Sequence, residues 1–380
     1  MIMFGMEFIN KEPFKDIYIH GLVRDEKGQK MSKSKGNVID PLELIEKYSA
    51  DALRFTLLSM ASPGRDVKLS EDRIKGYRNF LNKLWNANNF LIQNKCVFNN
   101  IKKVPKTKIN INKWIYSELL ETKNIVEKNI KEYRFDEAAR SAYQFVWHSY
   151  CDWYLELSKT ILYSNNMTAI KEVREIASFV FKEILVLMHP FIPFVTEEIW
   201  LKNKLDNSGK NYLMFSNWIA GKIKKDNDFK EVEKEIDIIT QIRSFKNELN
   251  INPGSYIDIS LVKINKKSKE FLKNNEIVLK KLGRINNIFD NESSKASASL
   301  VIGGDVFKLY FEENVDLNLI KENLINKQRK YESEIHRIQS RLKNKNFVDR
   351  APKHIVDQEK TNYTNLKNGI KKISLTVKNL

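Results

Sequence analysis

The feature that most constrains the fold is a stretch from about residue 70 to 202, in which apolar and aromatic side chains recur every three or four positions. This spacing puts them on one face of an α-helix, and that face must be buried. Polar segments at 93–110 and 163–169 interrupt the pattern, as loops do. We therefore predict an antiparallel helix bundle over residues 71–220. Its first helix would bury Tyr77, Phe80, Leu81, Leu84 and Trp85.

Residues 1–70 mix strand and helix signals. The apolar run IYIHGLV at 17–23 predicts a short buried strand. Asp40 can cap a helix whose first residue is Pro41, so a pair of helices is expected over roughly 41–60. The segment is therefore predicted to be an α/β piece.

A small α/β module is predicted over residues 221–313. A helix at about 227–250 would end at the NPG turn, and residues 256–262 alternate like a strand. The sequence ASLVIGGDVFKLYF at 298–311 predicts a β-hairpin that turns at its paired glycines.

Residues 314–380 carry two narrow apolar stripes separated by a short polar turn. Two such stripes predict an antiparallel coiled-coil hairpin. The alternative is a pair of ordinary amphipathic helices packed on the bundle. The expected fold class is mainly α with α/β pieces. The stripes consist of Ile320, Leu324, Tyr331, Ile335, Ile338 and Leu342, and then of Ile355, Tyr363, Leu366, Ile370 and Ile373.

The length and the net charge of the chain limit the classes of function that it can have. A chain of 380 residues is long enough for two or three domains, and its 42% hydrophobic content is that of a globular protein. The formal net charge of +17 favours a polyanionic partner such as nucleic acid, although abundant lysine throughout the chain weakens that inference. No apolar run has the length of a membrane span, and the first residues lack a leader pattern. A cytoplasmic protein that does not bind membranes is expected.

The cysteines do not indicate a disulfide framework or a metal site. Cys96 and Cys151 are far apart and form no CxxC pair. His148 precedes Cys151 by three positions, but two ligands do not complete a metal site. We predict that the aromatic helix containing them is packed in the core and that the chain holds no metal.

The lysine-rich stretch QKMSKSKGN at 29–37 is the strongest candidate for a functional site. When a carboxylate attacks the α-phosphate of a nucleotide, negative charge moves to the departing pyrophosphate, and ammonium groups that reach it lower the barrier. Lys30 and Lys33 bracket Met31 and Ser32, so both could converge on one phosphate chain. A solvated basic loop is the alternative when the stretch is taken alone.

Three longer segments carry a family resemblance. HGLVRDEKGQKMSKSKGNVIDPLELIEKYSADALRF resembles the signature-loop region of class I aminoacyl-tRNA synthetases, in which KMSKS is the second nucleotide-binding motif. ASPGRDVKLSEDRIKGYRNFLNKLWNANNF resembles the valyl-tRNA synthetases rather than the isoleucyl or leucyl ones. FVDRAPKHIVDQEK is similar to the turn of the valyl coiled coil. The isoleucyl enzymes would have C-terminal cysteine pairs for zinc, which are absent here.

The resemblance implies roles for particular residues. The chain would act in ATP-dependent ligation of valine to tRNA(Val), with Lys30 and Lys33 as catalytic residues. Magnesium is expected with ATP, without a ligand identified in this chain. The bundle would bind the anticodon, and the coiled-coil arm would steady the tRNA. ATP would be bound by Lys30, Met31, Ser32, Lys33 and Ser34, together with His20 and Gly21. The tRNA would be bound by Arg65, Asp66 and Arg73. Packing of the strand explains His20 and Gly21 equally well, and a salt-bridged surface explains the three tRNA-binding candidates equally well.

The sequence departs from the family pattern in what it lacks. The HIGH motif, the valine pocket and the editing domain do not occur, so the chain is expected to begin inside the second half of the catalytic fold. One interpretation is a monomeric C-terminal part, truncated or encoded by a split gene, that works with a separate N-terminal half and is inactive alone. The other is a non-catalytic tRNA-binding module derived from a synthetase.

Overall fold

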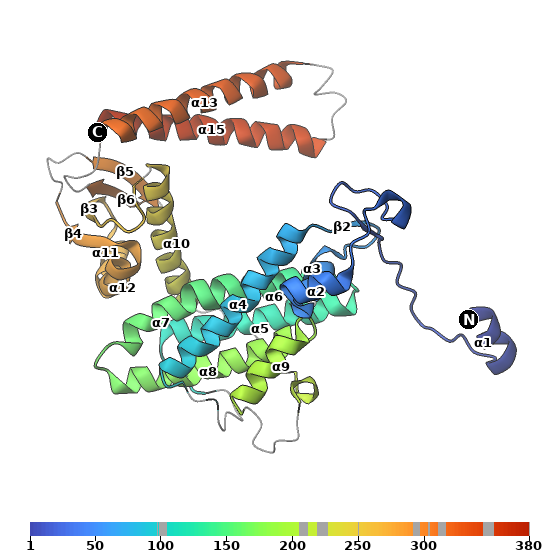
Figure 1. Ribbon diagram of the computed structural model, residues 1–380. Coiled ribbons are helices and arrows are strands. Elements are labelled where there is room, and N and C mark those ends of the chain that lie inside the picture. The colour runs from blue at the N-terminus through green and yellow to red at the C-terminus, as the bar shows by residue number, and fades with distance from the viewer. Residues whose placement is uncertain are drawn as a thin grey trace. The chain divides into compact units, whose positions relative to one another are not determined.

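The computed structural model describes residues 1–96, 98, 105–204, 212–218, 227–249, 251–291, 297–302, 305–310, 317–344 and 353–379. The chain forms two compact units, Met1–Val232 and Glu233–Leu380. Helices make up most of both units, and small sheets and loops make up the remainder of the described residues (Figure 1), which confirms the predicted fold class. No helix among the described residues is both long and apolar enough to cross a membrane. The four-part division of the chain stays a prediction.

The helix bundle expected from the apolar periodicity is present in the first unit (Figure 1). Phe55 lies at its aromatic core and contacts Tyr77, Phe80, Tyr143 and Phe191, with ring centroids 4.8–6.3 Å apart. The connection predicted at 163–169 is present as a turn, although it is shorter than predicted, because α8 already begins at Met167. The bundle consists of α4 (Glu71–Gln93), α5 (Asn110–Lys131), α6 (Phe135–Gln144), the π-helical η2 (Phe145–Tyr154), α7 (Leu155–Leu162), α8 (Met167–Met188) and α9 (Pro193–Lys202).

A buried ion pair joins two helices of the bundle. Lys123 on α5 donates from Nζ to Oε2 of Glu183 on α8 at 2.6 Å, and their side chains are 1% and 4% exposed. The Lys123 ammonium also lies 4.5 Å from the ring centroid of Trp218. Neither charge can be left alone in this apolar interior, because an unpaired buried ion is strongly disfavoured.

Asp51 of the ADALR segment caps a helix far away in the sequence. It lies on α3 (Ala50–Met60), is buried, and accepts hydrogen bonds from the backbone N–H groups of Phe194 and Val195 at 3.2 and 2.7 Å. These groups belong to the first turn of α9, where backbone donors have no partner within the helix. Burial raises the pKa of the Asp51 carboxyl, while the two backbone donors oppose that shift.

Replacing Asp51 by alanine is therefore expected to destabilise the first unit by about 1–2 kcal/mol, the usual cost of losing a helix cap. Urea unfolding followed by tryptophan fluorescence would measure it. Asp72→Ala removes an exposed carboxylate from the first turn of α4 and serves as the control. Equal stability of the two variants would show that Asp51 does not hold α9.

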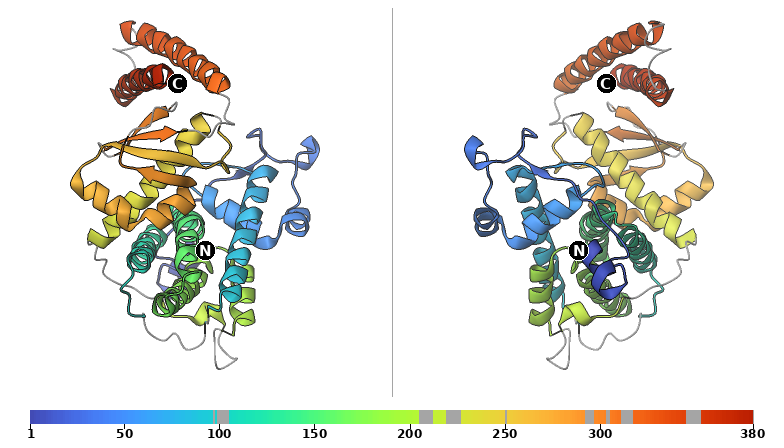
Figure 2. Two further views of the ribbon diagram at one scale, coloured as in Figure 1. Left: turned by 90° about the vertical axis from the view of Figure 1, so that its left-hand side faces the viewer. Right: turned by 90° about the vertical axis from the view of Figure 1, so that its right-hand side faces the viewer.

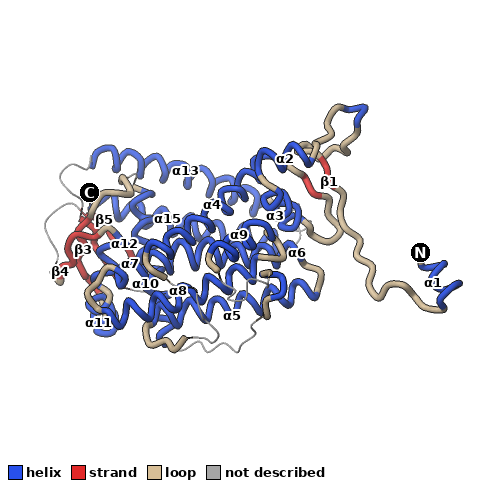
Figure 3. Tube along the Cα trace, turned by 60° about the horizontal axis from the view of Figure 1, so that its bottom comes forward, coloured by secondary structure: helices blue, strands red, loops and turns tan. Residues whose placement is uncertain are grey.

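The prediction of a buried strand at 17–23 is wrong. Only Val23–Arg24 forms a strand, β1, which pairs in parallel with β2 (Val67–Lys68). Figure 3 shows the preceding residues as an extended loop that follows α1 (Ile2–Ile9). Ile17 and Ile19 are 71% and 80% exposed, because no other described strand lies beside them to cover the apolar side chains.

The expected helix pair is confirmed as α2 (Pro41–Tyr48) and α3. Asp40 precedes α2 with extended backbone angles, and its Oδ1 accepts the backbone N–H of Leu42 at 2.8 Å. Pro41 is the first helical residue. The two helix-start signals predicted from the sequence, the Asp40 cap and Pro41 at the first position, are both present in the structure.

The second unit begins within α10 (Asn227–Glu248) and contains a four-stranded sheet with the order β4-β3-β6-β5. β3 pairs in parallel with β4 and antiparallel with β6, and β5 pairs antiparallel with β6, as the predicted hairpin requires. The predicted turn of that hairpin lies outside the described residues. Figure 2 shows the strands with their helices beside them. The remaining elements are β3 (Ile257–Lys263), α11 (Lys266–Asn274), α12 (Glu276–Gly283), β4 (Ile285–Phe289), β5 (Ser297–Ile302) and β6 (Asp305–Tyr310).

Two cations of α10 cap the C-terminal end of α12. Arg243 donates to the carbonyl of Leu282, and Lys246, which is 2% exposed, donates from Nζ to the carbonyls of Ser255, Gly283 and Arg284 at 2.9–3.2 Å. Carbonyls at a helix C-terminus have no partner within the helix and carry partial negative charge. The cations therefore tie α10 to α12.

The two stripes at the C-terminus form long helices, α13 (Leu317–Lys343) and α15 (Lys353–Asn379), which run side by side (Figure 1). Their contacts are antiparallel: Gln339 donates to the hydroxyl of Tyr363, and Arg341 pairs with Glu359, both at 3.0 Å. The coiled-coil hairpin predicted from the sequence is confirmed. The predicted turn between the helices lies outside the described residues.

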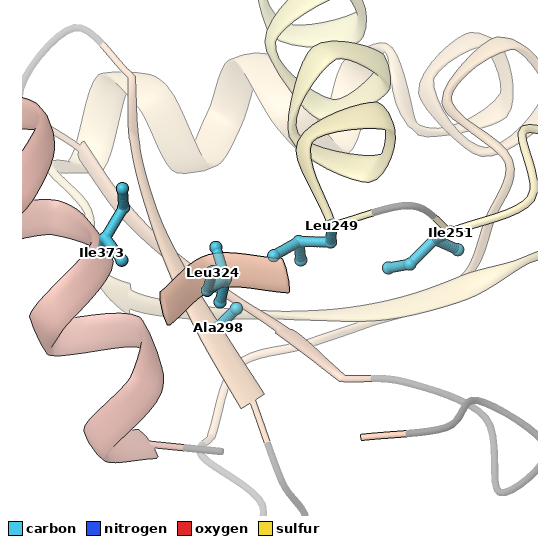
Figure 4. Close-up of a cluster of buried hydrophobic side chains, with 5 residues drawn as sticks. All are labelled: Leu249, Ile251, Ala298, Leu324 and Ile373. Atoms are coloured by element: carbon cyan, nitrogen blue, oxygen red, sulfur yellow. The ribbon is translucent and has the colours of Figure 1, made fainter. Parts of the chain in front are cut away.

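One end of this hairpin is packed on the sheet module of the same unit. Leu324 of α13 and Ile373 of α15 form a buried cluster with Ala298 of β5 and with Leu249 and Ile251, which follow α10 (Figure 4). Burying such apolar side chains contributes roughly 1.5–3 kcal/mol each. The hairpin is therefore anchored at this end by ordinary hydrophobic packing.

Candidate functional site

The lysine loop is preceded by a tight turn. Asp25 and Gln29 exchange two hydrogen bonds, one between their backbones at 3.1 Å and one from the Gln29 N–H to Oδ1 of Asp25 at 2.6 Å. Gly28 has a φ of +78°, a value that favours glycine, and its N–H donates to the Asp25 carbonyl. Lys30 then forms an antiparallel bridge with Arg24. The turn brings Lys30 back beside the strand that precedes it.

The KMSKS residues are largely exposed. Lys33–Lys35 form one turn of 3₁₀-helix, η1, which ends at Gly36 with a φ of +64°. Lys30, Lys33 and Lys35 are exposed, and Met31 and Ser32 are half-buried. The hydroxyls of Ser32 and Ser34 are 3.2 Å apart. Lys30 and Lys33 thus lie on one short, solvent-facing loop, as a shared phosphate ligand would require.

None of the loop lysines forms an ion pair within the described residues, unlike Lys47, which pairs with Glu71 at 2.5 Å, or Lys123 in the bundle. Three ammonium groups within six positions leave the loop strongly positive. A phosphate chain is a ligand that this arrangement attracts.

Two residues that the sequence analysis did not single out organise the loop, namely Asn37 and Asp25. The Asn37 side chain accepts the N–H of Ser32 at 3.0 Å and donates to Oδ2 of Asp25 at 2.8 Å and to the carbonyl of Lys30 at 3.3 Å. The Asn37 amide, more than the Gln29 N–H, holds the pKa of the Asp25 carboxyl below its usual value. No sequence signal marked this pair, apart from its position at the two ends of the loop.

His20 and Gly21 lie just before β1. His20 is exposed, and its Nδ1 is 2.7 Å from the carbonyl of Gly21. Gly21 approaches the neighbouring backbone so closely that a Cβ there would lie 1.9 Å from the carbonyl oxygen of Arg65. This position therefore requires glycine for packing, whatever its relation to a nucleotide.

Of the three residues predicted to bind tRNA, Asp66 has a structural role in holding the strand before the lysine loop. Its carboxylate accepts the N–H of Leu22 at 3.0 Å and pairs with the Arg24 guanidinium. Both contacts, the Leu22 N–H first, lower the pKa of the Asp66 carboxyl. Arg65 and Arg73 are exposed and form no ion pair within the described residues. The structure brings Asp66 into contact with the strand before the lysine loop, and it does not link Arg73 to that strand.

Four aromatic side chains of the bundle helices fall into two groups. Trp114 and Tyr154 are buried, and the Tyr154 hydroxyl donates to Asn112 at 2.8 Å, so these two form part of the core. Tyr143 and Trp147 are half-buried and stack on each other with ring centroids 5.6 Å apart, and the Lys83 ammonium lies 3.8 Å from the Trp147 ring centroid. A base that stacked on Trp147 would compete with these contacts.

Three protein-family models match this chain. Residues 1–70 match tRNA synthetases class I (I, L, M and V), residues 112–261 the anticodon-binding domain of tRNA ligase, and residues 316–380 the valyl tRNA synthetase tRNA binding arm. The lysine loop falls in the first match, the aromatic helices mainly in the second, and the helical hairpin in the third.

Similar curated proteins are valine--tRNA ligases. The chain is 67% identical over 380 residues to that of Pelagibacter ubique (strain HTCC1062), and the match covers the whole chain and 43% of the relative. It is 40% identical to that of Bartonella quintana (strain Toulouse), again over the whole chain and 42% of the relative. The chain thus spans less than half the length of these proteins.

Solved structures give weaker matches. The ternary complex of Agrobacterium radiobacter K84 agnB2 LeuRS, tRNA and LeuAMS has a TM-score of 0.45 at 18% identity, over 77% of this chain and 36% of that one. Mycobacterium tuberculosis methionyl-tRNA synthetase with methionyl-adenylate has a TM-score of 0.39 at 19% identity, over 51% of this chain and 40% of that one.

Proposed function

Because this chain belongs to the valine--tRNA ligase family, we propose that it supplies the lysine loop and the tRNA-binding parts of an enzyme that joins valine to tRNA(Val) with ATP. The observation that carries the proposal is the exposed lysine loop, whose ammonium groups have no ion-pair partner within the described residues, inside a class I synthetase match. The enzyme would act as a monomer in the cytoplasm.

The reaction would proceed in two steps. A carboxylate oxygen of valine attacks the α-phosphorus of ATP, the bond to the β-phosphate oxygen breaks, and pyrophosphate leaves. A ribose hydroxyl of the tRNA then attacks the carbonyl carbon of valyl-adenylate, and AMP leaves. Lys30 and Lys33 stabilise the charge that develops on the departing pyrophosphate, an interaction that is stronger in the transition state than in the ground state.

The remaining residues of the loop bind the nucleotide in this proposal. The hydroxyls of Ser32 and Ser34 donate to phosphate oxygens, and half-buried Met31 anchors the loop. His20 and Gly21, at the start of the neighbouring strand, lie close to the nucleotide. Magnesium would accompany ATP in this proposal. Among the described residues, no group of three His, Cys, Asp or Glu side chains could hold a metal ion.

The tRNA is bound by the basic parts of the chain. A net charge of +17 attracts phosphates over a long range, and two of the matching families are named for anticodon binding and for a tRNA binding arm. Arg65 and Arg73 are exposed and contact phosphates, whereas Asp66 acts through its contacts with Leu22 and Arg24.

A further proposed partner of this chain is a separate N-terminal half that carries the rest of the catalytic site. Large apolar side chains before β1 are exposed, which is unfavourable in water and suits a protein interface. They would contact a separate N-terminal half, which corresponds to the part of the relatives that this chain does not cover. The most exposed of these side chains are those of Met1, Met3, Phe4, Phe8, Ile9, Ile17 and Ile19.

Replacing Lys33 by alanine tests the proposal. In the ligase assembled from this chain and a separately expressed N-terminal half, valine-dependent ATP–pyrophosphate exchange should fall by about a hundredfold, as when one preorganised transition-state donor is removed. The tRNA dissociation constant should change by less than about twofold, because one exposed charge among many contributes little to it. Lys35→Ala, in the same 3₁₀ turn, is the matched control and should have a smaller effect.

The second candidate function predicts another outcome. The family names for tRNA binding would suit a non-catalytic tRNA-binding module equally well. Such a module would show no exchange in the mixture and would still bind tRNA with strong salt dependence. Loss of tRNA binding in Lys33→Ala, with exchange unchanged, would refute the role proposed for Lys33.

A further inference from the structure

Asn37 joins three separate points of the lysine loop. The loop contains two turns, one at Asp25–Gln29 and one in which Gly36 and Lys35 donate to the carbonyls of Lys33 and Ser32. The Asn37 side chain bonds to the carboxylate that begins the first turn, to the carbonyl of Lys30 and to the N–H of Ser32. A single side chain thus fixes the first turn relative to the second.

The chemistry of these contacts is specific to an amide. An asparagine side chain has two N–H donors and one carbonyl acceptor. Here both donors are used, toward Asp25 Oδ2 and the Lys30 carbonyl, and the acceptor takes the Ser32 N–H. Aspartate has no donor at neutral pH and would place a second carboxylate against Asp25. Alanine would leave all three groups without this partner.

The hydrogen bonds of Asn37 lie in the part of the loop where the lysine side chains repel one another. Lys30, Lys33 and Lys35 repel one another, and their side chains gain no ion pair within the described residues. Repulsion of this kind favours an open loop, in which the ammonium groups separate. Asn37 bonds to the backbone at Lys30 and at Ser32, on both sides of Met31. The side chains of Lys30 and Lys33 therefore extend from a backbone segment that these bonds hold in place.

We propose that Asn37 is a positioning residue that, through Asp25, holds Lys30 and Lys33 in one geometry toward a phosphate chain. The proposal rests on the proposed function for the role of the lysines, while the clamp itself, defined as the Asp25–Asn37 pair, rests on the hydrogen bonds alone. The clamp shapes the loop before any nucleotide binds, so less order has to be gained in the reaction.

A charge-conserving exchange separates the clamp from other effects. Asn37→Asp breaks the pair, whereas the double variant Asp25→Asn/Asn37→Asp restores a donor and an acceptor in reversed order with the same net charge. In the double variant the Gln29 and Ser32 N–H groups also keep an acceptor oxygen, and only the Lys30 carbonyl loses its partner. Recovery in the double variant is therefore expected only if the two side chains act as a pair.

Limited trypsin digestion of the 380-residue chain measures the loop without any nucleotide. Asn37→Asp should raise the cleavage rate after Lys30, Lys33 and Lys35 by about tenfold, since local opening controls cleavage and the variant loses several hydrogen bonds. Cleavage after Lys11 and Lys15, in the extended segment before β1, should not change. The double variant should return to within about threefold of the original rate.

The exchange assay then connects the clamp to the reaction. In the assembled ligase, Asn37→Asp should lower kcat for ATP–pyrophosphate exchange by about tenfold with the KM for valine unchanged, and the double variant should recover most of it. Unchanged cleavage in Asn37→Asp would overturn the clamp. Faster cleavage with unchanged exchange would overturn the positioning role, while the Lys33→Ala result decides independently whether the loop handles pyrophosphate.

Discussion

Replacing Lys123 by methionine is expected to lower the unfolding free energy of the first unit by about 3–5 kcal/mol, because the variant leaves the Glu183 carboxylate buried without its partner. Methionine fills much of the space of the lysine stem, so the loss reflects the charge rather than a cavity. The contact with the Trp218 ring would be lost as well.

Tryptophan fluorescence during urea unfolding isolates this effect. All six tryptophans of the chain lie within Met1–Val232, so the signal reports on the first unit alone. Lys128→Met is the matched control, since Lys128 lies on the same helix with a side chain 71% exposed and a surface partner at 3.9 Å. That change should cost less than about 0.5 kcal/mol.

A second variant tests the cause. Lys123→Met combined with Glu183→Leu removes both charges, and it should recover most of the lost stability because an apolar pair tolerates this interior. If the double variant is no more stable than Lys123→Met, the ion pair is not the source of the effect, and lost packing would explain it instead.

The second large effect concerns Glu235 on α10, in the second unit. Its side chain is buried, at 4% exposure, and its Oε1 has no hydrogen-bond partner among the described residues. Burial raises the pKa of the Glu235 carboxyl from 4.5 to about 7. The folded protein therefore keeps a proton that the unfolded chain releases between those values.

The sign of the pH dependence follows from that proton. A raised pKa favours the folded state at low pH, and the contribution is lost as the pH rises from about 4.5 through about 7. The full shift corresponds to about 3 kcal/mol, since one pKa unit is about 1.4 kcal/mol. Glu235→Gln does not ionise, so it should be more stable than the original chain by about 3 kcal/mol at pH 8 and similar to it at pH 4.5.

Amide hydrogen exchange of β3 and β6 measures this difference in the second unit, where tryptophan is absent. Variant and original chain are compared at the same pH, so that their intrinsic exchange rates cancel. Glu233→Gln changes an exposed carboxylate one half-turn away on α10 and should have no pH-dependent effect. Equal protection of Glu235→Gln and the original chain at pH 8 would contradict the raised pKa.

Much of the secondary structure could be predicted from local sequence. The bundle helices, the α2–α3 pair with its Asp40 cap, and the long helices of the hairpin follow from periodicity and capping, which involve residues only three or four positions apart. The KMSKS loop was found for the same reason, as its lysines and serines are adjacent in the chain. The family resemblance read from these segments was confirmed by the similarity to valine--tRNA ligases.

The tertiary contacts that organise the site could not be predicted from local sequence patterns. IYIHGLV has a strand pattern, yet it stays mostly extended and exposed, because a strand also needs a neighbour to pair with and the described residues offer only Val67–Lys68. Trp114 and Trp147 both lie in segments with a helical apolar pattern, but one is buried and the other lies beside the Lys83 ammonium. Burial depends on the packing of whole helices, which local patterns do not specify.

The sequence by itself determined the helices, the lysine loop and the family, since each depends on residues close together in the chain. Only the tertiary structure decided that Asp51 caps a helix 144 residues away, that Lys123 meets Glu183 across the bundle, and that Asn37 reaches back to Asp25. The physical reason is that a hydrogen bond requires its atoms to be about 3 Å apart, and for distant residues only the packed fold sets that separation.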